Sequence, residues 1–192
     1  MRTAPTNMLN HESQQARGAR ALTLEARLLY LRNWELANVL LVPALIAVIW
    51  LAGGDPARVW HRRAIGAIAV SWVLLQGGVY WHIKLAALRK RTSEFPSWFA
   101  GLFTTFRWIN LPLFAAGGVW MFRSSADRGS GISADLPWAL ALLTLAVLEH
   151  INYFHRQLMH DTVNDMAYLR RYRRLRRAPL AHDLRRAIAA QK

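Results

Sequence analysis

Hydrophobic residues fall in four long blocks along the chain, separated by shorter polar segments. An α-helix rises about 1.5 Å per residue, so a block of about 20 apolar residues crosses the hydrocarbon core of a bilayer. The first two blocks are apolar on all sides instead of along one stripe, which favours membrane spans over the helices of a soluble bundle. The pattern predicts an all-α, integral membrane four-helix bundle with spans at residues 36–54, 64–81, 98–122 and 136–154.

A weaker amphipathic pattern precedes the first block. Leu24, Leu28 and Leu31 recur at helical spacing among arginines, which predicts an interfacial helix over residues 20–35 that lies on the membrane. Residues 1–19 are mostly polar and are expected to be disordered. The transmembrane domain is therefore expected to occupy residues 36–155.

A basic tail follows the last span, over residues 156–192. Within residues 168–177, apolar positions alternate with pairs of arginines, which is typical of a helix at a membrane surface. Pro179 follows this helix, and a second helix is expected over residues 180–188. Each basic residue near an anionic surface contributes about 1 kcal/mol, so anionic lipid is the expected partner of the tail.

The distribution of charge predicts an orientation. The chain of 192 residues is 54% hydrophobic and has a formal net charge of +14, with 25 Lys and Arg against 11 Asp and Glu. Of the basic residues, 19 lie in the N-terminal segment, the second loop and the tail, and 5 lie in the first and third loops. Because Lys and Arg concentrate on the cytoplasmic side, both termini are expected in the cytoplasm, with the plasma membrane as the location. Orientation explains the basic charge without nucleic acid as a partner.

Polar residues within the spans gather in the half that this orientation places next to the cytoplasm. Glu149 and Asn152 share one face of the fourth span, and Gln76, Tyr80 and Lys84 recur every four residues on the second. Polar faces at similar depth on several helices predict one polar site. The candidate ligand-binding residues are Glu35, Asn38, Gln76, Tyr80, Lys84, Arg107, Asn110, Glu149, Asn152, Tyr153 and Arg156.

Glu149 is expected to be neutral or paired, because a bare carboxylate at this depth costs at least about 2 kcal/mol. Arg107 is the best-placed partner, and Glu35 is the second candidate. In one interpretation the pair fixes helix register in a structural or accessory subunit. In the other, a cytoplasm-facing cavity binds or transforms a small lipophilic ligand. The sequence does not decide whether the protein is an enzyme, and the catalytic candidates are Glu149, Arg107, Tyr80 and Tyr153.

No metal or cofactor is expected. The chain has no cysteine, which excludes disulfides and thiolate metal sites. His150, His155 and His160 are five residues apart, about 140° around a helix, so no two share a ligand face. Glycine pairs such as the one at Gly77 lack the motif of a phosphate loop and are expected to allow close helix packing. A single b-type haem between His82 and a fourth-span histidine, and transport by an oligomer, are lesser alternatives. A homo-oligomer or another membrane protein is a further candidate partner.

Overall fold

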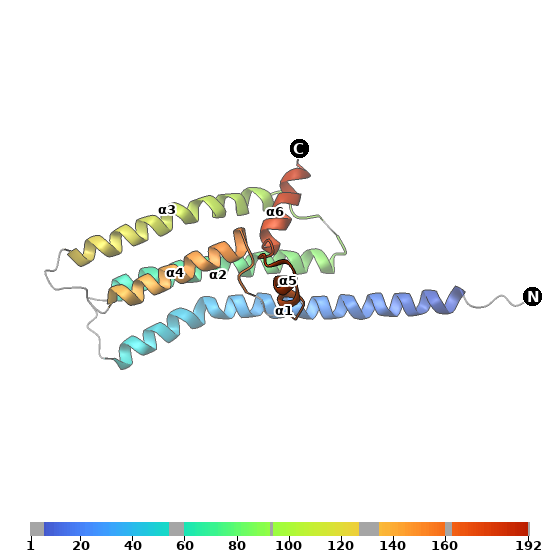
Figure 1. Cartoon of the computed structure of the whole chain (residues 1–192), viewed down its shortest axis with the longest axis horizontal. Coiled ribbons are helices and arrows are strands. Elements are labelled where there is room, and N and C mark those ends of the chain that lie inside the picture. The colour runs from blue at the N-terminus through green and yellow to red at the C-terminus, as the bar shows by residue number, and fades with distance from the viewer. Residues whose placement is uncertain (1–5, 54–59, 93, 127–134, 160–162, 192) are drawn as a thin grey trace, which may run out of the picture.

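The computed structural model describes residues 6–53, 60–92, 94–126, 135–159 and 163–191. In these residues the regular structure is helical, apart from one isolated backbone bridge between Arg156 and Arg177. The predicted all-α class is therefore confirmed. The helices are α1 (Thr6–Ala52), α2 (Trp60–Arg89), α3 (Phe99–Ala126), α4 (Asp135–Phe154), α5 (Val163–Tyr172) and α6 (Pro179–Ala189) (Figure 1).

The first helix is a single element of 47 residues. It runs without a break through the segments predicted as disordered, interfacial and membrane-spanning, so the predicted boundaries at residues 19 and 35 are not helix ends. The reason is local: no proline interrupts residues 6–42, which are rich in Ala, Leu, Arg, Gln and Glu. Pro43 lies inside the helix, where its ring removes a backbone hydrogen bond, and Figure 1 shows α1 bending in its C-terminal part.

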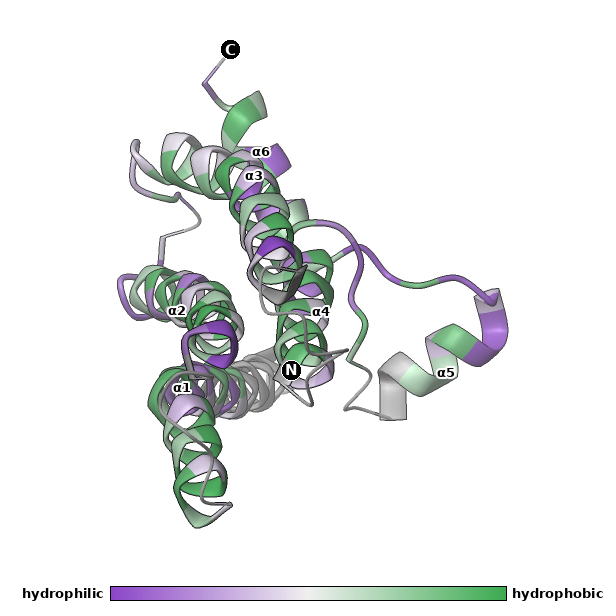
Figure 2. Cartoon of the chain, turned by 90° about the vertical axis from the view of Figure 1, so that its left-hand side faces the viewer, coloured by the Kyte–Doolittle hydropathy of each residue, from purple (hydrophilic) through white to green (hydrophobic). Residues whose placement is uncertain are grey.

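Successive long helices run in opposite directions, with α2 packed against both α1 and α4 (Figures 1 and 2). α3 packs mainly along α4. Two glycines of α2 make these approaches close, and one of them, Gly78, belongs to a glycine pair predicted to allow close packing. A Cβ atom at Gly66 would lie 2.7 Å from Cβ of Leu142 on α4, and one at Gly78 would lie 2.7 Å from Cδ2 of Leu36 on α1. The absence of a side chain therefore sets the distances of α2 from both neighbours.

Three stretches are long and apolar enough to cross a membrane, namely Thr23–Ala52 in α1, His61–Arg89 in α2 and Leu136–Phe154 in α4. Hydrophobic residues make up much of the long helices (Figure 2), and many of their large side chains are exposed, with Leu40 on α1 73% exposed. Surfaces of this kind indicate a membrane protein. α3 has 28 residues but carries Arg107 and Pro112, and among the described helices it is not clearly a fourth span.

The chain after α4 folds back onto the bundle. α5 ends at Tyr172, because Arg173 adopts a left-handed conformation with φ of 49°. The helix predicted over residues 168–177 therefore ends five residues early. Gln157 N donates to Arg176 O at 2.9 Å, which holds the strand-like segment before α6 against the chain that leaves α4.

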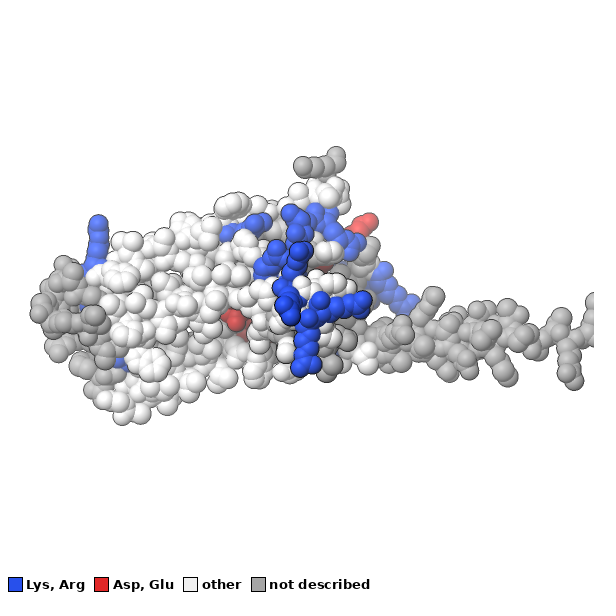
Figure 3. Space-filling view, in the orientation of Figure 1, with Lys and Arg blue, Asp and Glu red and all other residues white. Residues whose placement is uncertain are grey.

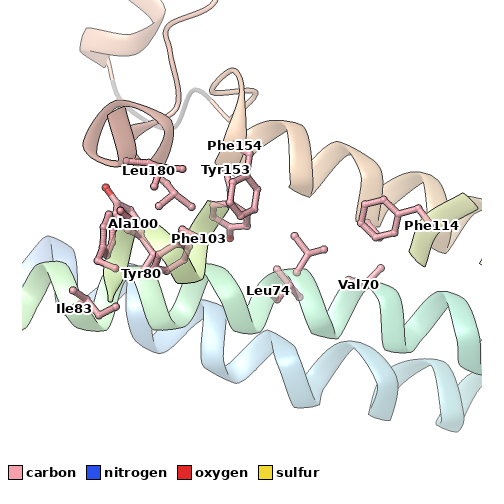
Figure 4. Packing of buried hydrophobic residues seen from close by; sticks show 14 residues of the cluster. Val70, Leu74, Tyr80, Ile83, Ala100, Phe103, Phe114, Tyr153, Phe154 and Leu180 are labelled. Atoms are coloured by element: carbon pink, nitrogen blue, oxygen red, sulfur yellow. The ribbon is translucent and has the colours of Figure 1, made fainter. Parts of the chain in front are cut away.

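The second predicted tail helix, residues 180–188, lies within α6, with Pro179 in its first turn. This helix docks on the bundle through buried Leu180 and Leu184. Figure 4 shows Leu180 beside the group formed by Tyr80, Ala100 and Phe103. The end of the bundle at which α6 lies is called the α6 end below, and the predicted polar residues lie toward it.

Candidate functional site

Two polar regions occupy the interior of the helical bundle. The first, called the amide network, consists of Trp72 and Gln76 on α2, Asn110 on α3 and His150 on α4. Asn110 Oδ1 accepts from Trp72 Nε1 at 2.9 Å and from Gln76 Nε2 at 3.1 Å. Asn110 Nδ2 donates to Gln76 Oε1 at 2.9 Å and contacts His150 Nδ1 at 3.1 Å. Gln76, Asn110 and His150 are all buried, so these bonds form away from solvent.

The Trp72 donor determines the orientation of the Asn110 amide and the tautomer of His150. An indole nitrogen can only donate, so the Asn110 atom beside Trp72 is the amide oxygen. The Asn110 amide nitrogen then faces His150 Nδ1, which must accept, and the neutral imidazole carries its proton on Nε2. Every amide atom of Gln76 and Asn110 thus has a partner from another helix. The buried Nε2 of His150 has no partner in the described part of the chain. The bonds of the network join α2, α3 and α4, which is the structural role that one interpretation of the sequence gave to the polar residues.

The structure does not form the predicted pair between Arg107 and Glu149. Within the described residues, the hydrogen bond of Glu149 comes from Asn152 Nδ2 at 3.3 Å. The Arg107 guanidinium lies 5.6 Å from the ring centre of Trp108. The pKa of His155 is lowered, first by the burial of His155 and second by the positive charge of Arg107. By residue count, Arg107 on α3 and Glu149 on α4 are at a similar level along the bundle. They lie on different sides of α4. Glu149 precedes His150 by about 100°, and only His150 faces α3.

The second polar region lines a pocket of about 490 Å³ between α1, α2, α4 and the start of α6. We call it the Glu35 pocket. Its walls combine apolar side chains, including Leu28, Leu31 and Leu74, with carboxyl and amide groups. Of the predicted site residues, those that line it are Glu35, Asn38, Tyr80, Lys84, Glu149, Asn152 and Tyr153.

Gly77 on α2 leaves the space that the Tyr153 ring occupies in the pocket wall. A Cβ atom there would lie 2.5 Å from both Cζ and Oη of Tyr153, so only glycine leaves room for the tyrosine ring. The buried Tyr153 hydroxyl then donates to Glu35 Oε1 on α1. Asn152 adds a second fixed contact, because its Oδ1 accepts from Leu158 N at 2.8 Å just after the end of α4. Glu35 and Glu149 are thereby held in the same pocket.

A third group, called the α6 clamp, closes the α6 end of the pocket. Asp183 Oδ2 accepts from Tyr80 Oη at 2.7 Å and from Lys84 Nζ at 2.7 Å, and Lys84 Nζ also lies 2.9 Å from Tyr80 Oη. Burial alone would raise the pKa of Asp183, but the bonds from Lys84 and Tyr80 outweigh it and hold that pKa below its usual value. Asp183 was not predicted. The available signal was that it is the single acidic residue in residues 166–192, among many arginines.

The four remaining predicted residues do not line the pocket. Gln76 and Asn110 belong to the amide network, and Arg107 lies beside Trp108. Arg156 is exposed beyond the end of α4 and donates to Leu175 O at 3.3 Å. Arg156 does not share a helix face with Glu149 and Asn152, because α4 ends at Phe154. His160 lies outside the described residues.

Across the described ranges, no group of three or more His, Asp or Glu is placed to hold a metal ion. The Glu35 pocket offers carboxyl, phenol, amide and cationic groups beside apolar walls. No protein-family model matches the chain, and no curated protein or solved structure matches it either.

Proposed function

We propose that this chain is a four-span protein of the plasma membrane with both termini in the cytoplasm. α3 serves as the fourth span in this proposal, because its 28 residues exceed the about 20 needed to cross a bilayer and it runs beside α4. The arginines of α5, α6 and the segment between them gather at the α6 end (Figure 3), which makes that end cytoplasmic by the distribution of positive charge.

Labelling of single engineered cysteines with a membrane-impermeant reagent tests this topology, because the native chain has none. A cysteine inserted next to residue 1, or next to residue 192, should be labelled only in inverted vesicles or after permeabilisation. Cysteines in the first and third loops should be labelled in intact cells. Labelling of either terminus from outside would contradict the proposal.

The Glu35 pocket binds or transforms a small lipophilic ligand at the cytoplasmic boundary of the membrane. One observation carries this function: a pocket of about 490 Å³ whose lining combines leucines with two carboxyl groups that each accept one hydrogen bond from the protein. Its volume lies in the range of small-molecule sites, about 300–1,000 Å³. Its apolar wall on α1 and α2 suits an alkyl or ring system, and its acids and amides suit a polar end group.

A photoreactive probe tests ligand binding directly. A dodecanol that carries a diazirine should label peptides that contain pocket residues when it is activated in phosphatidylcholine nanodiscs. Leu31→Trp fills the pocket and should reduce that labelling. Leu41→Trp is the matched control, because Leu41 lies on the same helix and is exposed away from the pocket. Equal labelling of the two variants at the pocket peptides would contradict the function.

Catalysis at the pocket would use Glu149 as an acid or base, with Tyr153 and Tyr80 as further candidates. A catalytic carboxyl must release or accept a proton, which an amide cannot do. Glu149→Gln should therefore abolish turnover of a bound ligand while leaving binding of the diazirine probe intact. A loss of probe labelling in this variant would instead assign Glu149 to binding.

An accessory, non-catalytic subunit is the second candidate function. The amide network favours it, since Gln76 and Asn110 bond only to groups of other helices. Residues of that kind stabilise a bundle without a ligand. A protein with this role would give no specific labelling in the photoreactive experiment.

The exposed arginines of the tail bind anionic lipid in this proposal. Arg170, Arg171 and Arg174 are exposed around α5 and the chain after it. A peptide of residues 168–177 should bind phosphatidylglycerol vesicles and lose that binding as salt rises. Equal binding to phosphatidylcholine vesicles would remove the electrostatic basis of the assignment.

A further inference from the structure

The carboxyl groups of the Glu35 pocket lack a protein cation. Glu35 accepts from the Tyr153 hydroxyl and Glu149 from the Asn152 amide, and both donors are neutral. In the described part of the chain, neither carboxyl forms an ion pair with Lys, Arg or His. Lys84, which also lines the pocket, is bound to Asp183 at 2.7 Å. The pocket therefore contains two acids whose negative charge no side chain offsets by direct contact.

Two carboxylates beside apolar walls need an external proton or cation. A carboxyl group can accept about four hydrogen bonds when ionised, and each one here receives a single bond from the protein. A primary ammonium offers three donors and one positive charge. Placed between Glu35 and Glu149, it would bond to both groups and offset charge that the surrounding leucines cannot solvate.

We infer that the ligand of the Glu35 pocket is a lipophilic primary amine, whose ammonium lies between Glu35 and Glu149 and whose chain follows Leu28, Leu31 and Leu74. This inference rests on the proposed ligand-binding function and adds the chemical class of the ligand. The apolar part of the wall includes several leucines together with Trp34 and Trp81, which suits an alkyl chain.

Positive residues on the pocket wall set the orientation of such a ligand. Arg27 precedes Glu35 by eight residues, about 12 Å along α1 toward the N-terminus. Arg176 and Lys84 line the wall near the start of α6. An ammonium near these residues would be repelled, so the carboxyl groups are the favoured position for the amine.

Matched alkyl probes test the inference on the full-length protein in phosphatidylcholine nanodiscs. The thermal unfolding midpoint is followed while dodecylamine or dodecanol is added, with empty nanodiscs as the partition control. Dodecylamine should bind about tenfold to a hundredfold more tightly than dodecanol, as expected for one or two charge-assisted hydrogen bonds. Equal binding of the two probes would overturn the amine assignment and leave the pocket function intact. Binding of neither probe would overturn both.

A charge-neutral variant locates the effect. Glu35→Gln with Glu149→Gln keeps side-chain size and removes both negative charges, so the preference for dodecylamine should disappear. Glu25→Gln with Glu94→Gln is the matched control, because both residues are acids outside the pocket and the change in net charge is the same. A preference that persisted in the pocket variant, or disappeared in the control, would overturn the assignment. The wild-type comparison of probes stands even if the pocket variant does not fold.

A lipid headgroup and a free amine share this chemistry, and the nanodisc composition separates them. Phosphatidylethanolamine has a primary ammonium, whereas phosphatidylcholine has no N–H donor. If adding phosphatidylethanolamine raises the unfolding midpoint and weakens dodecylamine binding, the amine belongs to a lipid. If dodecylamine binding is unchanged, the amine is a free one. Either result supports the amine class.

Discussion

The amide network and the Glu35 pocket lie side by side in the same bundle and share α2 and α4. Their residues are neighbours in sequence: Glu149 belongs to the pocket and His150 to the network. In the network, amide groups of α2 and α3 bond to each other and to an indole and an imidazole. In the pocket, each carboxyl has one partner and faces open volume. Adjacent polar residues on one helix can therefore have opposite roles.

The difference follows from hydrogen-bond chemistry. An amide group both donates and accepts, so amides from two helices can satisfy each other without any other molecule. An ionised carboxyl group only accepts, and two of them cannot satisfy each other. A protein that places Gln76 opposite Asn110 obtains two amides that bond to each other. One that places Glu35 near Glu149 leaves acceptors for a proton or a ligand.

Removing the central amide should have the largest effect on stability. Asn110→Leu leaves buried groups of Trp72, Gln76 and His150 unpaired, and should lower the free energy of unfolding by about 3 kcal/mol. Glu149→Gln in the pocket should change it by less than about 1 kcal/mol. Unfolding in mixed micelles with an increasing fraction of denaturing detergent measures both. Equal costs would remove the distinction between the amide network and the Glu35 pocket.

Filling the space at Gly77 should disturb the pocket and leave the amide network in place. Gly77→Ala displaces the Tyr153 ring and should cost about 2 kcal/mol of stability while weakening dodecylamine binding. Gly101→Ala is the matched control, because nothing lies within 4 Å of its added Cβ. It should stabilise α3 by up to about 1 kcal/mol. Unchanged binding in Gly77→Ala would show that Tyr153 does not shape the site.

Breaking the α6 clamp should open one end of the pocket. Asp183→Asn removes the charge that Lys84 and Tyr80 contact, so hydrogen exchange of the α6 amides should accelerate about tenfold. The folded pKa of Asp183 lies below its usual 3.8, so the clamp is complete above that value and weakens as pH falls through the lower folded pKa. Exchange normalised for intrinsic rate should be constant between about pH 5 and 8. Loss of protection near neutral pH would contradict this assignment.

The smallest effect is expected at the exposed ion pair between α1 and α2. Arg89 Nε lies 2.7 Å from Glu25 Oε1, with the side chains 51% and 33% exposed. Glu25→Gln should change the free energy of unfolding by less than about 0.5 kcal/mol, because water screens the pair. If Glu25→Gln lowered the free energy of unfolding as much as Asp183→Asn does, charge alone, and not burial, would determine the strength of these contacts.

Local pattern determined much of the fold. The fourth predicted span, 136–154, agrees with α4 to within one residue, and the third begins within one residue of α3. These boundaries follow from the length of apolar blocks and from helix-ending residues, which need no tertiary contact. The same pattern placed the polar residues toward one end of the bundle, and seven of the eleven candidates line one pocket.

Tertiary structure decided which side of each helix meets which neighbour. Arg107 and Glu149 are level by residue count, but helix rotation depends on close contacts such as that between Gly78 and Leu36. The docking of Asp183 on Tyr80 joins residues 103 positions apart, which no local pattern encodes. Local pattern thus set the bounds of α4, the start of α3 and the end of the bundle toward which the polar groups lie. Packing decided their partners, because partner choice depends on helix rotation and on contacts between segments distant in the chain.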